Sequence, residues 1–251
     1  MRTANPALND KTFRRFENDP AYAVGESTTM TLEGTVVRTG LLMCILVITA
    51  AATWTRTMDA GSYGGVAPWM IGGAIGGLIL GLIISFKPTT APMLSPLYAA
   101  AEGLFLGALS AMAHLRYPGI AWQAITLTMG VALSLLIAYS TRMIRPSENF
   151  KLGIAAATGG IFMVYGLSFV LSFFGIQMPY LHSSGPIGIG ISVVIVIIAA
   201  LNLVLDFDFI ENGVEKGAPK YMEWVAAFGL MVTLIWLYIE ILHLLMKLRE
   251  R

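Results

Sequence analysis

The sequence predicts an all-α integral membrane protein, a bundle of about seven transmembrane helices with almost no soluble structure. Hydrophobic residues make up 56% of the 251 residues and charged residues only 12%, whereas an ordinary soluble domain is about 25% charged. The mean hydropathy is +0.72. A helix needs about 20 apolar residues to cross a bilayer core, and segments of this kind fill most of the chain after residue 32. So few charges cannot cover a water-facing surface, so we expect most of the surface to face lipid.

The chain divides into two predicted parts, a polar tail over residues 1–32 and a single seven-helix domain over residues 33–251. The tail has no apolar core near its start, so we predict no cleavable signal peptide and expect the first helix to direct insertion. Each predicted helix is an apolar segment long enough to span a bilayer. The expected helices cover residues 34–54, 69–86, 93–113, 120–144, 152–175, 187–205 and 224–246.

Prolines mark three of the helix boundaries. Pro88 and Pro146 are expected to end the second and fourth helices, because proline disfavours the helical conformation of the residue before it. Pro186 follows a serine and a glycine and is expected in the first turn of the sixth helix. All the connections are short, so consecutive helices are predicted to be antiparallel neighbours.

The distribution of lysine and arginine predicts a cytoplasmic N-terminus, because most basic residues near the ends of the spans then lie on the cytoplasmic side. The basic residues at the C-terminus lie on the other side if the last helix crosses completely. Two arrangements therefore stay open, seven full spans or six spans with a last helix that re-enters the same face.

Four carboxylates fall inside or at the end of the apolar segments. Glu102 is about 14 Å and 16 Å from the two ends of the third segment, close to the midplane of the membrane. Glu240 is about 24 Å from the start of the seventh segment and 9 Å from its end. Asp206 and Asp208 follow the sixth segment, near the predicted cytoplasmic edge, and point about 200° apart on a helix, so they cannot face one cavity.

Two interpretations of these acids are open. In the first, intramembrane carboxylates bind a cation or a proton along a path through the bundle. In the second, Glu102 and Glu240 are neutral or hydrogen-bonded and stabilise helix packing, while Asp206 and Asp208 are solvated acids at a helix end. His243 lies three residues after Glu240 on the same helix face. It is either a pH-responsive group or an interfacial side chain.

Other motifs add little chemistry. The sequence has no nucleophile, metalloprotease or phosphate-loop motif, and no pair of histidines or cysteines has the spacing of metal ligands, so we do not predict an enzyme. The net charge of +1 gives no indication of a nucleic-acid partner. Small residues four apart predict close helix packing. These glycines are Gly72, Gly73, Gly76, Gly77 and Gly81 in the second helix, and Gly103 and Gly107 in the third.

Several stretches, in order along the chain, resemble the Bax inhibitor-1 family, also called the transmembrane Bax inhibitor motif or YccA-like family, and most of all its bacterial branch. They extend from the second predicted helix to the last. The stretches are IGGAIGGL at 71–78, LYAAAEGLFLG at 97–107, IAAATGG at 154–160, ALNLVLDFDFIE at 200–211, APKYMEW at 218–224 and LYIEIL at 237–242.

The resemblance implies a seven-helix bundle whose last helix is surrounded by the other six. It also implies a pH-sensitive calcium leak, gated by two acids on the sixth and seventh helices that share a proton. Matched residue by residue, these acids are Asp206, with Asp208 as the alternative register, and Glu240. Asp206 and Glu240 are then the candidate calcium ligands, and Glu102 is the alternative partner if the pair is built differently.

The sequence thus leads to two functional hypotheses. The first is a calcium or cation leak channel in the inner membrane of a bacterium, with calcium and protons as its only ligands besides the lipid bilayer and with no cofactor. The second is a membrane regulator that transports nothing and interacts with a membrane-bound AAA protease through the N-terminal tail. A leak requires the intramembrane acids, whereas a regulator requires the tail.

Overall fold

The computed structural model describes residues 29–60, 66–175 and 183–250, and nearly all of them are helical. The prediction of an all-α fold with seven membrane-spanning helices is confirmed, because the described residues contain seven helices long and apolar enough to cross a membrane. They are α2 (Leu32–Ala60), α3 (Ala67–Phe86), α4 (Ala91–Arg116), α5 (Ile120–Ser140), α6 (Glu148–Ser172), α8 (Pro186–Glu215) and α9 (Met222–Arg249), with a short 3-10 helix η3 (Pro88–Thr90) before α4.

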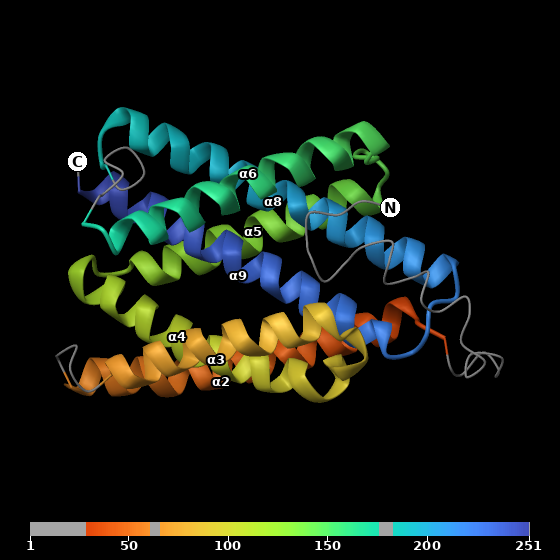
Figure 1. Cartoon of the computed structure of the whole chain (residues 1–251), viewed down its shortest axis with the longest axis horizontal. Helices are drawn as coiled ribbons and strands as arrows, with labels where there is room; N and C mark the ends of the chain where they lie inside the picture. Colours follow the sequence, from red (N-terminus) through yellow and green to blue (C-terminus); the bar gives the residue numbers. More distant parts are fainter. Residues whose placement is uncertain (1–28, 61–65, 176–182, 251) are drawn as a thin grey trace.

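The helices run antiparallel along the long axis of the molecule (Figure 1). We call the end at which α2 and α9 begin the N-terminal end of the bundle, and the end at which α9 finishes the C-terminal end. In Figure 1, α2, α3 and α4 lie on one side of α9, and α5, α6 and α8 lie on the other. The continuous α9 reaches from one end to the other, which favours seven full spans over a re-entrant last helix.

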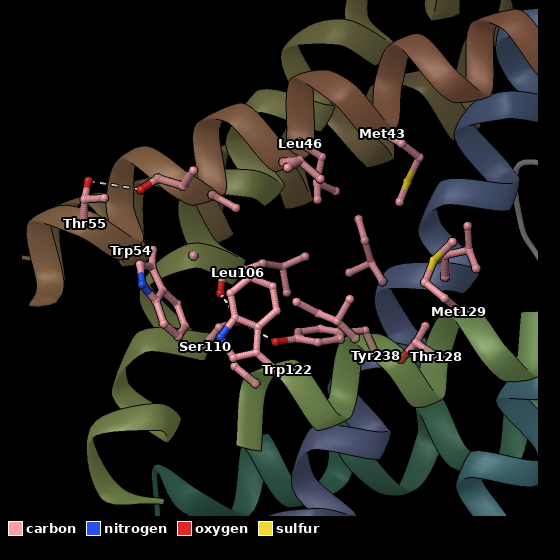
Figure 2. Close-up of a pocket in the computed structure, with 18 residues that line it drawn as sticks. Met43, Leu46, Trp54, Thr55, Leu106, Ser110, Trp122, Thr128, Met129 and Tyr238 are labelled. Atoms are coloured by element: carbon pink, nitrogen blue, oxygen red, sulfur yellow. Dashed lines mark hydrogen bonds between the residues drawn. The ribbon is translucent and has the colours of Figure 1, made fainter. Parts of the chain in front are cut away.

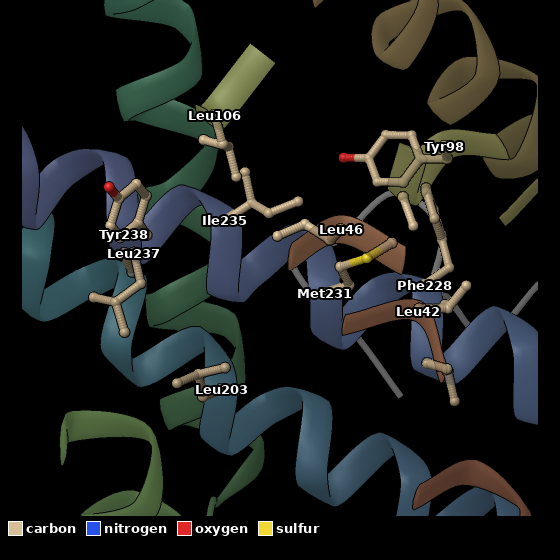
Figure 3. Close-up of a cluster of buried hydrophobic side chains, with 14 of the residues drawn as sticks. Leu42, Leu46, Tyr98, Leu106, Leu203, Phe228, Met231, Ile235, Leu237 and Tyr238 are labelled. Atoms are coloured by element: carbon tan, nitrogen blue, oxygen red, sulfur yellow. The ribbon is translucent and has the colours of Figure 1, made fainter. Parts of the chain in front are cut away.

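The last helix occupies the centre of the bundle, as the family resemblance implied. α9 packs against α2, α4, α5 and α8, and its side chains are buried on all sides from Met222 to Leu242. Figure 3 shows part of this core, in which α9 meets leucines of α2, α4 and α8 and a tyrosine of α4. The labelled residues are Leu42, Leu46, Tyr98, Leu106, Leu203, Phe228, Met231, Ile235, Leu237 and Tyr238.

The glycines predicted to permit close packing do so where α4 meets α3 and α2. A Cβ atom added at Gly73 would lie 2.5 Å from the carbonyl oxygen of Ala101, and one at Gly77 would lie 2.5 Å from Oε1 of Glu102. Gly107 of α4 lies against the backbone of Ala50 in α2. A side chain at Gly73 or Gly107 would meet backbone atoms and push the helices apart, whereas one at Gly77 would meet the end of the Glu102 side chain.

The sixth spanning helix differs most from its predicted bounds. It was expected to end near residue 205, but α8 continues to Glu215. The extra residues are rich in acids and lack the hydropathy of a span, yet they stay helical because Lys151 of α6 and Arg142, just after α5, pair with them. Asp206 consequently lies nine residues inside the helix, about 14 Å from its end. The expectation that Asp206 is a solvated acid at a helix end is wrong, since it is 1% exposed.

Candidate functional site

Polar side chains recur every seven residues along α6 and α9 where these two helices meet α8. Seven residues bring an α-helix back to nearly the same face, about 10 Å further along its axis. These side chains therefore form a line along the bundle within apolar surroundings. We call this line the polar seam. It consists of Lys151, Thr158 and Tyr165 on α6, Thr233, Glu240 and Lys247 on α9, and Ser192, Asn202, Asp206 and Asp208 on α8.

Ion pairs occupy the N-terminal end of the seam. Lys151 is 7% exposed, and its Nζ lies 2.7 Å from Oδ2 of Asp208 and 3.1 Å from Oε1 of Glu148. Next to this pair, Arg142, two residues beyond the end of α5, lies 2.5 Å from Glu211 of α8. Asp208 is thus a largely buried partner of a lysine, and the prediction that it is simply a solvated acid is wrong. These contacts connect α5, α6 and α8 at one end of the bundle.

The middle of the seam contains its least satisfied group. Asn202 donates to Oγ1 of Thr158 over 2.8 Å and to the backbone oxygen of Ile198 over 2.8 Å. Asp206 lies one turn further along α8 and has the hydroxyl of Thr233 as its hydrogen-bonding neighbour. Its Oδ2 is buried and has no hydrogen-bond partner among the described residues.

Glu240 is held by donors from two helices. It is 3% exposed and accepts hydrogen bonds from the hydroxyl of Tyr165, at 3.0 and 3.1 Å. It also accepts one from Nε1 of Trp236 at 3.1 Å. The Trp236 ring packs against Phe162 of α6 with a centroid separation of 5.5 Å. The Glu240 carboxyl is therefore enclosed between α6 and α9 and has three donor contacts. The Asp206 carboxyl has fewer.

A lysine closes the C-terminal end of the seam. Nζ of Lys247 donates to Oγ of Ser192 over 2.8 Å and to the backbone oxygen of Gly188 over 3.3 Å. It lies seven residues beyond Glu240 on the same face of α9 and interacts with it electrostatically. The seam thus has a lysine at each end and two buried carboxyls between them.

The structure does not bring Asp206 and Glu240 together as a hydrogen-bonded pair. Thr233, the neighbour of Asp206, is seven residues before Glu240 on α9, or about 10 Å along the helix. The described hydrogen-bonding partners of Glu240 are Tyr165 and Trp236. The two acids do lie on the same seam, two turns apart. The shared proton implied by the resemblance therefore requires a different conformation or an intervening group.

Glu102 lies away from the seam. It is on α4, where it rests against Gly77 of α3 and interacts with the hydroxyl of Tyr98. α4 is on the side of α9 opposite α6 (Figure 1). Glu102 is therefore not brought together with Asp206 or Glu240. His243 is exposed on α9, one turn after Glu240.

The described carboxyls of the seam stand apart and do not form one cluster. Within the described ranges, no group of three or more histidine, cysteine, aspartate or glutamate side chains could hold a metal ion. Calcium prefers six to eight oxygen ligands, whereas Asp206 and Glu240 are single carboxyls with few oxygen neighbours. If either contacts calcium, water must supply most of the ligands.

The acids of the seam were predicted from the sequence, but their partners on α6 were not. Lys151, Thr158 and Tyr165 were not selected, although their seven-residue spacing within an apolar segment is visible in the sequence. The same spacing links Thr233, Glu240 and Lys247 on α9. A search for polar residues seven apart in predicted spans would have found both sets.

Comparison with known proteins gives one match over nearly the whole chain. The family model described as Bax inhibitor 1 like matches residues 5–250, which includes every residue of the polar seam. Searches of curated proteins and of solved structures return no match.

Proposed function

The chain belongs to the Bax inhibitor 1 like family, and from this membership and the polar seam we propose that it is a pH-sensitive cation leak that passes calcium. Asp206 and Glu240 are the proposed gating groups. The observation that carries the proposal is the buried Oδ2 of Asp206, which has no partner among the described residues. It lies between the two lysine-closed ends of a line of polar groups that extends along the bundle.

We propose that protonation of Asp206 and Glu240 gates the cation path. A carboxylate buried in apolar surroundings costs several kcal/mol unless donors or cations compensate its charge. Asp206 has only one hydroxyl neighbour, so its ionisation changes the balance between this packed conformation and one that admits water or a cation to the seam. Two carboxyls on one path also titrate as a coupled system.

We propose that the described conformation is the closed state. The ion pair of Lys151 with Asp208 occupies one end of the seam, and Lys247 with Ser192 occupies the other. A cation that enters must displace an ammonium group of the same sign at each end. Separation of α6 from α8 and α9 would move Lys151 away from Asp208 and Tyr165 away from Glu240 together.

Orientation in the membrane is part of the proposal. We propose that the N-terminal end of the bundle faces the cytoplasm of a bacterium, because basic residues concentrate there. Transport rather than enzymatic chemistry is the proposed activity. The basic residues at this end are Arg38, Lys87, Arg142, Arg145, Lys151, Lys216 and Lys220.

Calcium flux into proteoliposomes between about pH 6 and pH 8 tests the function directly. Wild type is expected to leak calcium in a pH-dependent manner. Asp206→Asn and Glu240→Gln should flatten that dependence, because each removes one titrating group and keeps the side-chain shape. Glu102→Gln is the matched control, an equivalent change on the other side of α9, and should retain the wild-type profile. Wild-type flux equal to that of empty liposomes would overturn the proposal.

The alternative function is a regulator that contacts a membrane-bound AAA protease through the polar tail. Residues 1–28 of that tail lie outside the described residues. This alternative becomes the preferred function if wild type carries no calcium flux while deletion of the tail abolishes a cellular phenotype that the Asp206→Asn variant keeps.

A further inference from the structure

A second feature lies on the opposite face of α9, away from the polar seam. A cavity of about 350 Å³ opens between α2, α4, α5 and α9 (Figure 2). Its size falls within the range of small-molecule sites, about 300–1,000 Å³. Leu234 and Tyr238 form its wall on the central helix, whereas Thr233 and Glu240 of the same helix belong to the seam. The cavity is therefore a separate site.

The cavity is elongated along the bundle. On α2 its lining extends from Met43 to Thr55, twelve residues or about 18 Å of helix. The opposite wall on α5 extends from Ala121 to Met129. This length suits a flexible hydrocarbon chain better than a compact ligand.

The lining is apolar even where it contains hydroxyl groups. The side chains of Ser110 and Tyr238 are 2.5 Å apart and hydrogen-bond to each other, and Ser110 also bonds to the backbone oxygen of Leu106. Figure 2 shows these hydroxyls directed toward one another at one wall of the cavity. These hydroxyls already have hydrogen-bond partners within the protein. An alkyl chain can therefore occupy the space without leaving them unsatisfied.

The mouth of the cavity faces the membrane. Val47 of α2 and Trp122 of α5 both line it and are 57% and 64% exposed. Since both helices are spans, the molecules in contact with this opening are lipids. An acyl chain can therefore enter sideways between α2 and α5 without passing through water.

Aromatic and cationic groups lie at the C-terminal end of the cavity. The Trp54 ring packs against His114 at 5.1 Å and against Trp122 at 6.5 Å, the arrangement of an aromatic belt at a membrane interface. Beyond these rings, Arg249 reaches Gln123 in the first turn of α5 at 3.5 Å. Arg116 pairs nearby with Glu250 at 3.0 Å. Arginine side chains bind phosphate through charged hydrogen bonds.

From the cavity and its surroundings we propose that this site binds one acyl chain of a membrane phospholipid, with the headgroup phosphate at the level of Arg249 and Arg116. The chain lies along α2 and α5 and contacts Leu234 and Tyr238 of the central helix. It thereby supports α9 from the side opposite Glu240. The site does not depend on calcium transport.

Phospholipid retention provides the first test. Native mass spectrometry of the purified full-length protein in detergent should detect one phospholipid bound per chain. Ala51→Phe places a ring inside the cavity and should reduce retention about tenfold. Ala52→Phe is the matched control, because the next residue of α2 is also exposed but does not line the cavity. Equal retention by the two variants would overturn the proposal.

A fluorescence measurement on the wild type keeps the test independent of how the variants fold. A phosphatidylglycerol with brominated acyl chains, titrated in detergent micelles, should quench tryptophan fluorescence saturably, and Trp122→Phe should remove a large part of that quenching. Arg249→Gln should weaken the titration with the phospholipid and leave that with a brominated free fatty acid unchanged. Quenching that does not saturate, or that only the fatty acid produces, would contradict a phospholipid site.

Discussion

At the scale of single residues, the buried carboxyls of the bundle differ in how their charge is balanced. Glu223 at the start of α9 is fully buried and accepts from both the backbone and the hydroxyl of Thr31. It also pairs with Arg38 at 2.5 Å and with Lys220 at 2.9 Å. Asp206 has one hydroxyl neighbour and an unpartnered oxygen. Glu223 thus has the surroundings of a structural ion pair, and Asp206 those of a group that responds to protons.

Glu223→Gln is expected to destabilise the protein without altering the pH profile of calcium flux. The substitution leaves Arg38 and Lys220 without their anion, and we expect a loss of about 2 kcal/mol, since both basic groups still reach water. Thermal unfolding in detergent measures this loss. Glu33→Gln, an exposed acid in the first turn of α2, is the control and should leave the midpoint unchanged. A normal midpoint for Glu223→Gln would contradict the structural role.

Tyr165→Phe is expected to increase calcium flux several-fold, because it removes the α6 donor from Glu240 and leaves only Trp236. The proteoliposome assay used for the acids measures it. Tyr238→Phe is the matched control, since that hydroxyl bonds to Ser110 on the other face of α9. If both variants behave alike, the contact between α6 and Glu240 does not restrain the path.

Sequence patterns identified the acids at this scale but not their surroundings. Asp206, Glu240 and Glu102 stand out because charges are rare in apolar segments. Their partners come from helices far apart in the sequence, as Tyr165 and Glu240 do, so the contacts depend on tertiary packing. The resemblance implied a pair, and only the structure places Asp206 and Glu240 two turns apart.

At the scale of elements, α6 is held differently from the other helices of the bundle. Of its residues only Lys151 and Thr158 are buried, and both are polar members of the seam. α4, by contrast, buries a long row of small and apolar residues against α2 and α3. A helix that depends on hydrogen bonds and ion pairs separates more easily than one packed through glycines, which makes α6 the expected moving element.

Gly107→Ala and Gly130→Ala are expected to have opposite effects on stability. A methyl group at Gly107 would overlap the backbone of Ala50 in α2, whereas nothing lies within 4 Å of a Cβ at Gly130. We expect a loss of about 1–3 kcal/mol for Gly107→Ala from overpacking. Gly130→Ala should be neutral or slightly stabilising. Unfolding midpoints in detergent compare the two, and a stable Gly107→Ala variant would show that α2 and α4 can separate at little cost.

Helix ends were the least predictable feature of the elements. Hydropathy ends the sixth span near residue 205, because the following residues are acidic. The helix continues because Lys151 pairs with Asp208 and Arg142 with Glu211, and these pairings cannot be inferred from local composition. Proline boundaries were more reliable, as Pro186 does begin α8.

At the scale of the whole molecule, one central helix presents two different surfaces. One face of α9 carries Thr233, Glu240 and Lys247 toward α6 and α8. The other carries Leu234 and Tyr238 toward the cavity between α2 and α5. Because α9 carries both faces, a lipid that binds in the cavity can affect the polar seam through this one helix. The number of spans and the central last helix could be predicted from hydropathy and family resemblance, whereas these two faces required the structure.

If α9 crosses the membrane completely, its two ends lie on opposite sides, and this topology can be tested. With seven full spans, Lys216 between α8 and α9 lies at the N-terminal end of the bundle and Arg249 at the C-terminal end, and both are exposed. In a Cys44→Ala background, a membrane-impermeant maleimide applied to intact cells should label Arg249→Cys and not Lys216→Cys. Inverted vesicles should reverse the pattern, since basic residues favour the cytoplasm at the N-terminal end. Labelling of both cysteines from the same side would mean that the last helix re-enters, and the polar seam would then not connect the two faces of the membrane.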